Sequence, residues 1–312
     1  MKKIILAILS VLRLVSCKQS EKKNDLTKEN LKGKVKSIKE TTYEAVEKFG
    51  QIEKGDVLYD RDFSFTIYDK NGNKIEKNYY FSDGLYSKYT YKYDKKGNTI
   101  EINNYNSNGS IHEKYTFKYD EKGNNIERNW YDSDGSLIDK TTYEYDEKGN
   151  IIEEIYYNNG IIEKYNYDYN GRLGENYIYK YDEKGNIIEK NGHNYDGSYK
   201  ITYKYDEKGN NIEQNNYKYD GSFLYKYTYK YDEKGNIIEE NHYNSDGIFV
   251  GKITYKYDEK GNNIEKNNYD SNGRLDSKYT YEYDKNNNWT QRIEYKNTIP
   301  HRITERIIEY YP

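Results

Sequence analysis

Residues 227–236 read Tyr-Thr-Tyr-Lys-Tyr-Asp-Glu-Lys-Gly-Asn, and the last six of them recur along the chain as Tyr-Asp-x-x-Gly-Asn. The glycine of the motif stands at Gly72, Gly97, Gly123, Gly149, Gly185, Gly209, Gly235 and Gly261. A further copy at 283–288 has Asn287 in its place, and Asn tolerates the left-handed backbone best after glycine. Most steps between these glycines are 26 residues. This period indicates a repeat array and not a conventional globular core.

A second, looser set of turns lies between the Tyr-Asp turns. Each of these turns ends in a glycine that follows Asn or Asp: Gly84, Gly109, Gly135, Gly160, Gly171, Gly197, Gly221, Gly247 and Gly273. Asn-Gly and Asp-Gly between alternating residues are the strongest short hairpin signal. The two sets alternate every 11 to 14 residues, which leaves short strands and no room for helices. We therefore expect an all-β fold of tandem β-hairpin repeats.

The hairpins form a long antiparallel meander, and this meander is expected to curl. A flat single layer would leave its aromatic face wet and its edges open, so twist should produce a curled or spiralled sheet. The longer step of 36 residues from Gly149 to Gly185 contains the extra turn at Gly171, so the order of up and down strands shifts there.

The strands that enter a Tyr-Asp turn alternate tyrosine with Thr or Lys, so their rings share one face. The strands that leave it carry Ile three residues after the glycine and Glu next, as in Ile100 and Glu101. A four-residue turn pairs Tyr91 with Ile100 and makes an aromatic–aliphatic face, whereas a turn shortened by a glycine bulge sets Lys92 against Ile100. We expect the first register, because a one-residue slip would mix the faces.

The N-terminal part of the chain differs from the repeat. Residues 1–17 combine a basic start and a short apolar run with Leu-Val-Ser-Cys at 14–17, and they resemble a lipoprotein signal peptide with its lipobox. Cys17 is therefore the expected lipidation site, and lipid the expected membrane anchor. Residues 18–30 are almost without apolar side chains, which predicts a flexible tether.

Strand-like segments without the Tyr-Asp turn flank the repeats. They predict N-terminal capping strands over 31–67 and C-terminal capping strands over 289–312, on either side of a YD-like β-hairpin repeat array over 68–288.

The composition limits the partners. Lys and Arg number 50 against 53 Asp and Glu, so the basic excess of a nucleic-acid-binding protein is missing and no nucleic-acid partner is expected. Cys17 is the one cysteine, which excludes a disulfide within the chain. Tyrosine is unusually abundant, with 43 residues against 7 Phe and 2 Trp. These amphipathic rings can be half buried with their hydroxyl groups in water.

We expect a protein that is not an enzyme. The four histidines, His112, His193, His242 and His301, fall at different phases of the repeat and are interpreted as surface strand residues. The Glu series is expected to form cross-strand ion pairs with Lys, and the Asp of each Tyr-Asp turn to accept backbone N–H groups as an Asx turn. No catalytic residue, metal site or cofactor is predicted.

The tyrosine face is the candidate binding surface. Rings on a rigid strand array can bind sugar rings or the apolar groups of a partner, and the alternative is that they pack on one another to stabilise the sheet. The candidate residues are Tyr91, Tyr93, Tyr119, Tyr143, Tyr145, Tyr179, Tyr181, Tyr203, Tyr205, Tyr229, Tyr231, Tyr255 and Tyr257.

The repeated Tyr-x-Tyr-Asp-x-x-Gly-Asn, followed by a second Gly turn, resembles the YD repeat of Rhs-type and teneurin-like proteins. This resemblance covers roughly residues 68–288 and implies hairpin strips that wind into a hollow shell. Some members of that family enclose a C-terminal toxin, but nothing after Tyr295 looks like a toxin domain or a self-cleaving segment.

The functional hypothesis is a lipid-anchored repeat protein of the bacterial cell envelope, on the outer membrane or the cell surface. It would act as a non-enzymatic binding or adhesion scaffold, with carbohydrate or another envelope protein as candidate partners. The alternative is a small Rhs-like protective shell or an immunity-type (antitoxin) protein.

Overall fold

The structure, a computed structural model, describes residues 24–58, 63–158, 176–194, 197–218 and 220–312. Cys17 and the extra turn at Gly171 lie outside the described residues. One short helix, α1 (Asp25–Lys28), precedes the strands. The strands are β1 (Val35–Lys48), β2 (Gln51–Val57), β3 (Phe63–Tyr68), β4 (Lys74–Phe81), β5 (Gly84–Tyr93), β6 (Thr99–Asn106), β7 (Ile111–Tyr119), β8 (Asn125–Tyr131), β9 (Leu137–Tyr145), β10 (Ile151–Asn158), β11 (Asn176–Tyr181), β12 (Ile187–Asn194), β13 (Gly197–Tyr205), β14 (Asn211–Tyr217), β15 (Phe223–Tyr231), β16 (Ile237–Tyr243), β17 (Phe249–Tyr257), β18 (Asn263–Asp270), β19 (Leu275–Tyr283), β20 (Trp289–Lys296) and β21 (Ile299–Tyr310).

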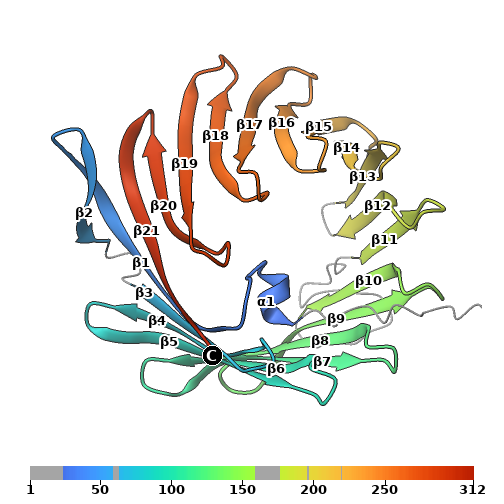
Figure 1. Cartoon of the computed structure of the whole chain (residues 1–312). Helices are drawn as coiled ribbons and strands as arrows, with labels where there is room; N and C mark the ends of the chain where they lie inside the picture. Colours follow the sequence, from blue (N-terminus) through green and yellow to red (C-terminus); the bar gives the residue numbers. More distant parts are fainter. Residues whose placement is uncertain (1–23, 59–62, 159–175, 195–196, 219) are drawn as a thin grey trace, which may run out of the picture.

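The strands form a single antiparallel sheet that closes into a barrel (Figure 1). From β3 to β21 each strand pairs with the next along the chain, which confirms the all-β hairpin meander. β1 then pairs with β21 along one edge and with β3 along the other. In the described part of the chain the ring has 20 strands, because β2 pairs with β1 and lies outside the closure.

The sheet is curled, as expected, and it also closes on itself into a barrel. The segments expected to act as separate caps, 31–67 and 289–312, contain the strands that pair with each other. β1 and β21 match from Val35 opposite Tyr310 to Glu44 opposite Arg302. The two edges of the meander thus satisfy one another, and the ring has no open edge at this seam.

Each Tyr-Asp turn is held by its own Asp and Asn. In the turn after β15, the Asp232 carboxylate accepts the backbone N–H of Asn236 at 2.8 Å and its side-chain amide at 2.8 Å. Gly235 donates its N–H to the Asp232 carbonyl at 3.1 Å and has φ of 87°. The expected Asx turn is confirmed, and the motif Asn is its second clamp.

We expect Gly123→Val to destabilise the protein by about 1–2 kcal/mol, because a β-branched residue resists the left-handed backbone. Gly123 has φ of +92°, and no atom within 4 Å would obstruct a Cβ, so the cost is conformational. Thermal unfolding measures it. Gly123→Asn is the matched control, since Asn287 adopts φ of 65° at the same turn position. Equal destabilisation by Val and Asn would contradict the backbone explanation.

The register at the Tyr-Asp turns differs from the expected one. Tyr91 is opposite Ile102, Lys92 is opposite Glu101, and Tyr93 is opposite Thr99, so Ile100 is an extra residue in a bulge. The prediction that Tyr91 pairs with Ile100 is wrong, and so is the Lys92–Ile100 alternative. The bulge lets Lys92 meet a carboxylate, while the motif isoleucines stay 37–42 % exposed.

Residues 24–30, which the composition assigns to a flexible tether, instead fold against the barrel. Asn24 caps α1, and Leu26 is 7 % exposed in a small core with Val35, Ile38 and Tyr68. The Leu26 N–H donates to the carbonyl of Gly72 in the first Tyr-Asp turn at 3.1 Å. The burial of Leu26, the Asn24 cap and the hydrogen bonds that Asp25 accepts from Lys74 and Tyr93 hold this segment on the barrel.

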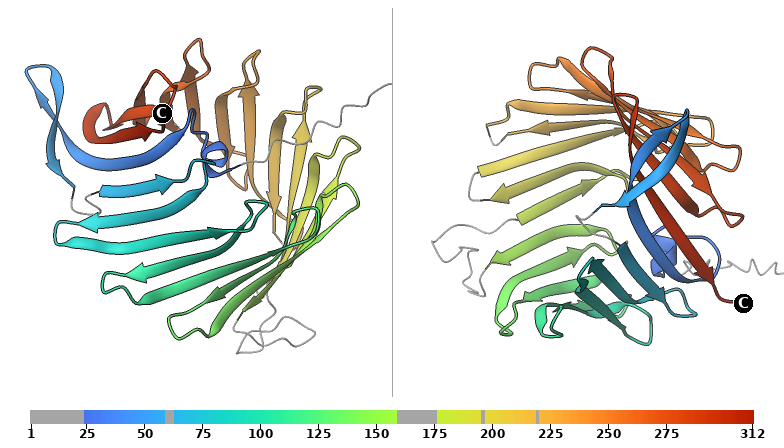
Figure 2. Two further views of the ribbon diagram at one scale, coloured as in Figure 1. Left: turned by 60° about the horizontal axis from the view of Figure 1, so that its bottom comes forward. Right: turned by 90° about the vertical axis from the view of Figure 1, so that its left-hand side faces the viewer.

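α1 lies within the outline of the ring and close to the C-terminus, at the end of the barrel that carries the Tyr-Asp turns (Figure 2). A cavity of about 330 Å³ joins Glu29 next to α1 with Ile38, Glu40, Lys77 and Arg306. These strand residues therefore point inward, and alternation along the strands places their sequence neighbours outward.

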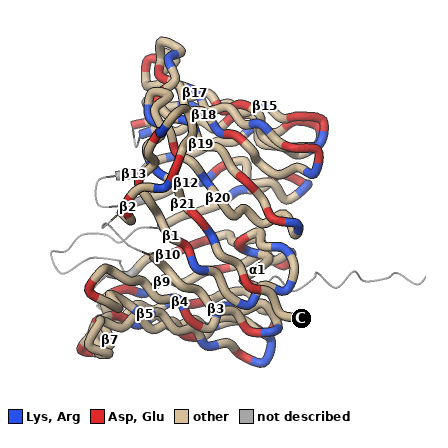
Figure 3. Tube along the Cα trace, turned by 60° about the vertical axis from the view of Figure 1, so that its left-hand side comes forward, with Lys and Arg blue, Asp and Glu red and all other residues tan. Residues whose placement is uncertain are grey.

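Charged residues of both signs are mixed along the strands (Figure 3). Glu101 contacts Lys92 at 2.6 Å and Lys114 at 3.1 Å, which lie on the two neighbouring strands. The same Lys–Glu–Lys bridge surrounds Glu127, Glu189 and Glu265. The expected cross-strand ion pairs are thus present, and they form a charged belt around the outside of the barrel.

Candidate functional site

The candidate tyrosines all lie on the inward side, in two tiers. The rim tier consists of the last tyrosine before each motif Asp: Tyr93, Tyr119, Tyr145, Tyr181, Tyr205, Tyr231 and Tyr257. The wall tier lies two residues earlier, deeper in the barrel: Tyr91, Tyr143, Tyr179, Tyr203, Tyr229 and Tyr255. The structure brings these residues together on one surface, but it gives the two tiers different tasks.

The rim tyrosines tie each hairpin to the one before it. The Tyr231 hydroxyl donates to the carbonyl of Asn211 at 2.6 Å, and the Tyr257 hydroxyl donates to the carbonyl of Ile237 at 2.8 Å. The accepting residue is always the second one after the glycine position of the preceding motif, where the bulge begins. The same bond is made by Tyr93, Tyr119, Tyr145, Tyr181, Tyr205 and Tyr283. The rim tier is therefore structural.

We expect Tyr231→Phe to lower the free energy of unfolding by about 1 kcal/mol, because it removes this hydrogen bond and leaves the Asn211 carbonyl without it. Denaturant unfolding of the purified protein measures the change. Tyr229→Phe is the control, since the Tyr229 hydroxyl has no hydrogen-bond partner among the described residues. A loss as large in Tyr229→Phe as in Tyr231→Phe would show that the hydroxyl bond is not the cause.

The wall tyrosines face polar and charged residues across the strands. Tyr143 is opposite Glu154, Tyr229 is opposite Glu240, and Tyr255 is opposite Lys266. The face is aromatic and aliphatic, as expected, where Tyr91 is opposite Ile102, and it is aromatic and ionic at the other pairs. Barrels much wider than eight strands are generally not filled by their own side chains, so we expect these groups to border space that a ligand can enter.

Cations lie over several of the inward rings. The Lys190 ammonium is 3.6 Å from the ring centroid of Tyr177 and 5.2 Å from that of Tyr179. The Arg306 guanidinium is 3.5 Å from the ring centroid of Trp289. Such contacts are cation–π interactions. They leave the inward wall with rings and positive charges in close alternation.

The wall phenols are neutral at physiological pH. Burial raises the pKa of Tyr229 to about 12 and that of Tyr255 to about 12, with neighbouring Glu240 adding to the effect. Burial and a hydrogen bond to Glu154 also raise the pKa of Tyr179. The hydroxyl groups can therefore donate to a ligand without carrying charge.

A cavity of about 530 Å³ opens on the inward side of the seam, where β1, β3, β4, β20 and β21 meet. It is lined by Glu40, Thr42, Phe63, Ser64, Lys77, Tyr79, Arg292, Glu294, Arg302 and Thr304. Arg306 donates from Nε to Glu40 at 2.7 Å, and Arg292 donates to the Thr304 hydroxyl at 3.2 Å. We refer to this space, together with the residues that line it, as the seam cavity.

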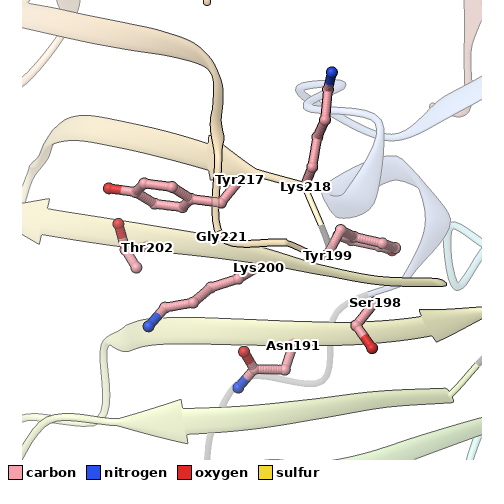
Figure 4. A pocket seen from close by; sticks show the side chains of 8 residues that line it. All are labelled: Asn191, Ser198, Tyr199, Lys200, Thr202, Tyr217, Lys218 and Gly221. Atoms are coloured by element: carbon pink, nitrogen blue, oxygen red, sulfur yellow. The ribbon is translucent and has the colours of Figure 1, made fainter.

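Another cavity, of about 420 Å³, lies over β12, β13 and β14 (Figure 4). Its cross-strand partners Lys200 and Tyr217 come from adjacent strands, and Asn191 and Thr202 complete the outward part of the lining. Lys200 is already paired with Glu189 at 2.8 Å, so this cavity belongs to the charged belt.

The arrangement offers binding groups more than catalytic ones. The described residues include no cluster of three or more His, Cys, Asp or Glu side chains that could hold a metal ion. His242, expected on the surface, faces inward instead, where it contacts Glu240 at 2.7 Å and the ring of Tyr227 at 4.7 Å. No helix in the described part of the chain is both long and apolar enough to span a membrane.

Sequence reasoning missed the inward charges. They occupy the second position after the motif isoleucine, and the position before it is Glu throughout. In successive repeats this second position reads Lys77, Ile102, Arg128, Glu154, Lys190, Gln214, Glu240 and Lys266. This variation within an otherwise regular repeat was the available signal. The seam residues of β1 and β21 lie outside the repeat and carried no such signal.

No protein-family model and no curated protein sequence matches the chain. Among solved structures, the chain is similar to the TcdB2–TccC3 complex with Cdc42, at 15% identity, with 80% of this chain and 16% of that chain covered and a TM-score of 0.32. It is also similar to the Tc holotoxin pore of Photorhabdus luminescens, at 15% identity, 83% and 16% coverage and a TM-score of 0.31. The chain thus spans about a sixth of the length of these toxin chains.

A porin-like protein from Bacteroides uniformis is similar at 10% identity, with 88% of this chain and 98% of that chain covered and a TM-score of 0.34. Likenesses with TM-scores this low carry no functional argument. The YD-repeat resemblance therefore rests on the motif residues themselves.

Proposed function

We propose that this protein is a lipid-anchored binding protein of the bacterial cell envelope that holds carbohydrate on the inward face of its barrel and catalyses no reaction. The residues of the inward wall are the observation that supports this proposal. It presents neutral tyrosine rings such as Tyr229 and Tyr255 next to hydrogen-bonding and charged groups such as Glu240 and Lys266. Sugar rings require this combination of flat apolar surface and polar partners.

The anchor part of the proposal comes from the lipobox-like Leu-Val-Ser-Cys at 14–17. The outward charged belt supports a barrel that stands in water, because a membrane-embedded barrel needs an outward apolar band about 25 Å tall. A lipid on Cys17 would then supply the attachment that the barrel surface does not.

Two separable experiments test the proposal. Metabolic labelling with a radioactive fatty acid is expected to mark the wild-type protein and to fail for Cys17→Ala; label retained by Cys17→Ala would overturn the anchor. A glycan array probed with Cys17→Ala is expected to show binding that the pair Tyr229→Ala and Tyr255→Ala abolishes. The outward pair Tyr243→Ala and Tyr269→Ala is the control. A blank array would overturn the carbohydrate part.

A second candidate function is a small protective shell around a polypeptide, in the manner of an immunity-type protein. One observation favours it, since residues 24–34 of this chain already lie on the inner side of the barrel. The Lys32 N–H donates to the Asn288 side chain at 2.8 Å, and the Asn288 amide donates to the Lys32 carbonyl at 2.8 Å. A toxin gene beside this one, with rescue of poisoned cells by its expression, would favour the shell over the carbohydrate site.

A further inference from the structure

The seam is the most polar part of the inward wall. The seam cavity shares Glu40, Ser64 and Lys77 with the smaller cavity that reaches α1, so the two are continuous along the inner side of β1 and β3. With a volume of about 530 Å³, the seam cavity lies within the range of small-ligand sites.

Positive charge exceeds negative charge along this wall. The two cavities together are lined by the cations Lys74, Lys77, Arg292, Arg302 and Arg306 and by the carboxylates Glu29, Glu40 and Glu294. Two of the carboxylates are already engaged, Glu40 by Arg306 at 2.7 Å and Glu29 by Lys74. Lys77 and Arg292 then face one further carboxylate, Glu294, in the lining of the seam cavity.

The side chains of Lys77 and Arg292 have donor groups available for an anion. Within the described residues, neither side chain has a carboxylate at ion-pair distance. Lys77 lies 4.9 Å from the ring centroid of Tyr79, and Arg292 makes one hydrogen bond, of 3.2 Å, to Thr304. A guanidinium has five N–H donors and an ammonium has three, so most of these donors remain available to a ligand.

Both cations are set beside aromatic rings. Arg292 lies 5.7 Å from the ring centroid of Trp289, and Tyr79 contributes its ring to the cavity wall. Serine and threonine hydroxyls, Ser64, Thr42 and Thr304, complete the lining. This combination fits a ligand that carries an acid group, hydroxyl groups and a ring face on the same unit.

We infer that the seam cavity binds an acidic carbohydrate chain, with Lys77 and Arg292 each holding a carboxylate or sulfate group of that chain. Arg292 on β20 provides the planar fork that matches such a group, and Lys77 provides a second positive charge from β4, on the other side of β3, β1 and β21. This inference rests on the proposed carbohydrate-binding function and names the class of sugar.

Calorimetric titration of the Cys17→Ala protein tests it. The probes are a uronic acid hexamer, a sulfated hexamer, a neutral hexamer of the same linkage, and inorganic sulfate. We expect binding of one acidic hexamer, with affinity falling as salt rises. Because each lost charge-assisted hydrogen bond weakens binding by about tenfold or more, Lys77→Gln with Arg292→Gln should abolish measurable binding.

Lys226→Gln is the matched control, because the Lys226 ammonium also lies over a ring, 4.7 Å from the centroid of Tyr243, but on the outward face. Arg292→Lys keeps the charge and should retain part of the affinity. Equal melting temperatures of all variants show that lost binding is not lost folding.

The possible results of the titration distinguish the acidic site from the carbohydrate-binding function. Equal binding of neutral and acidic hexamers, unchanged in the double variant, would overturn the acidic site and leave the carbohydrate function standing. Inorganic sulfate bound as tightly as the hexamers would overturn the carbohydrate as the ligand of this cavity. No binding of any hexamer would overturn both this inference and the proposed function.

Discussion

Removing residues 299–312 is expected to abolish the folded barrel. The deletion takes away β21, which closes the ring by pairing with β1 and β20. It also removes the Arg306–Glu40 ion pair and the hydrogen bond of 2.7 Å from the Tyr311 hydroxyl to the Tyr68 carbonyl. Two unpaired strand edges remain, and open edges recruit other chains.

The expected loss exceeds the stability of a typical domain, which is about 5–15 kcal/mol. We expect no cooperative thermal transition by far-UV circular dichroism and an aggregated species in size-exclusion chromatography. A truncated chain that elutes as a monomer and melts at the wild-type temperature would show that the ring does not need its seam.

A matched pair of proline substitutions tests the closure of the ring without shortening the chain. Thr304→Pro removes a backbone donor in the middle of β21, at a residue paired with Thr42 and Arg292. Glu53→Pro makes the same change in β2, which lies outside the ring and pairs only with β1 among the described strands. Proline is tolerated on edge strands, so Thr304→Pro should unfold the protein and Glu53→Pro should not.

Lowering the pH is the second change for which we expect a large loss of stability. Hydrogen bonds from Lys92 and Lys180 lower the pKa of Glu101 and of Glu189 to about 2. Burial of Glu127 and Glu265 opposes the shift, but their lysine partners still lower the pKa of each to about 2. A carboxylate whose pKa is lowered by folding stabilises the native state above its unfolded pKa, near 4.5. That stability is lost as pH falls towards 2.

Each bridge contributes little alone, because its lysines are largely exposed, but the bridges repeat around the barrel. Their effects on stability therefore add along the sheet. We expect the melting temperature to be constant between pH 7 and 5.5 and to fall steeply between pH 4.5 and 2. A variant with Gln at positions 101, 127, 189 and 265 should show a flatter curve. A wild-type melting temperature that does not change over this range would refute the stabilising role of the belt.

The turns could be predicted from the sequence because they are local. Asp232, Gly235 and Asn236 interact within five residues, so their chemistry alone determines the hairpin. Closure could not be predicted in this way, because Ser37 and Glu309 are far apart in the chain and nothing in either segment states its partner. The sequence therefore predicts the meander but not the pairing of its two end strands.

The expected register is wrong because Ile100 is an extra residue in a bulge, so Tyr91 is opposite Ile102 and not opposite the motif isoleucine Ile100. The position two residues after the motif isoleucine lies on the face of the tyrosines in both registers, so the bulge does not explain why its charges were missed. The candidate tyrosines could be recognised because they recur in every repeat. Lys77 stands at a position whose residue type varies between repeats, and Arg292 lies beyond the repeat array, so neither could be recognised in this way.

With Cys17 acylated as proposed, the docked N-terminal segment limits the distance between the barrel and the bilayer. Cys17 and Asn24 are seven residues apart (24 − 17), a span of at most about 25 Å when fully extended. With Cys17 acylated as proposed, the Tyr-Asp turns form the foot of the barrel and stay close to the lipid headgroups. The opposite rim, with turns such as those at Gly109 and Gly135, then points away from the membrane. A polymer too bulky for the narrow gap at the foot would approach from that distal rim.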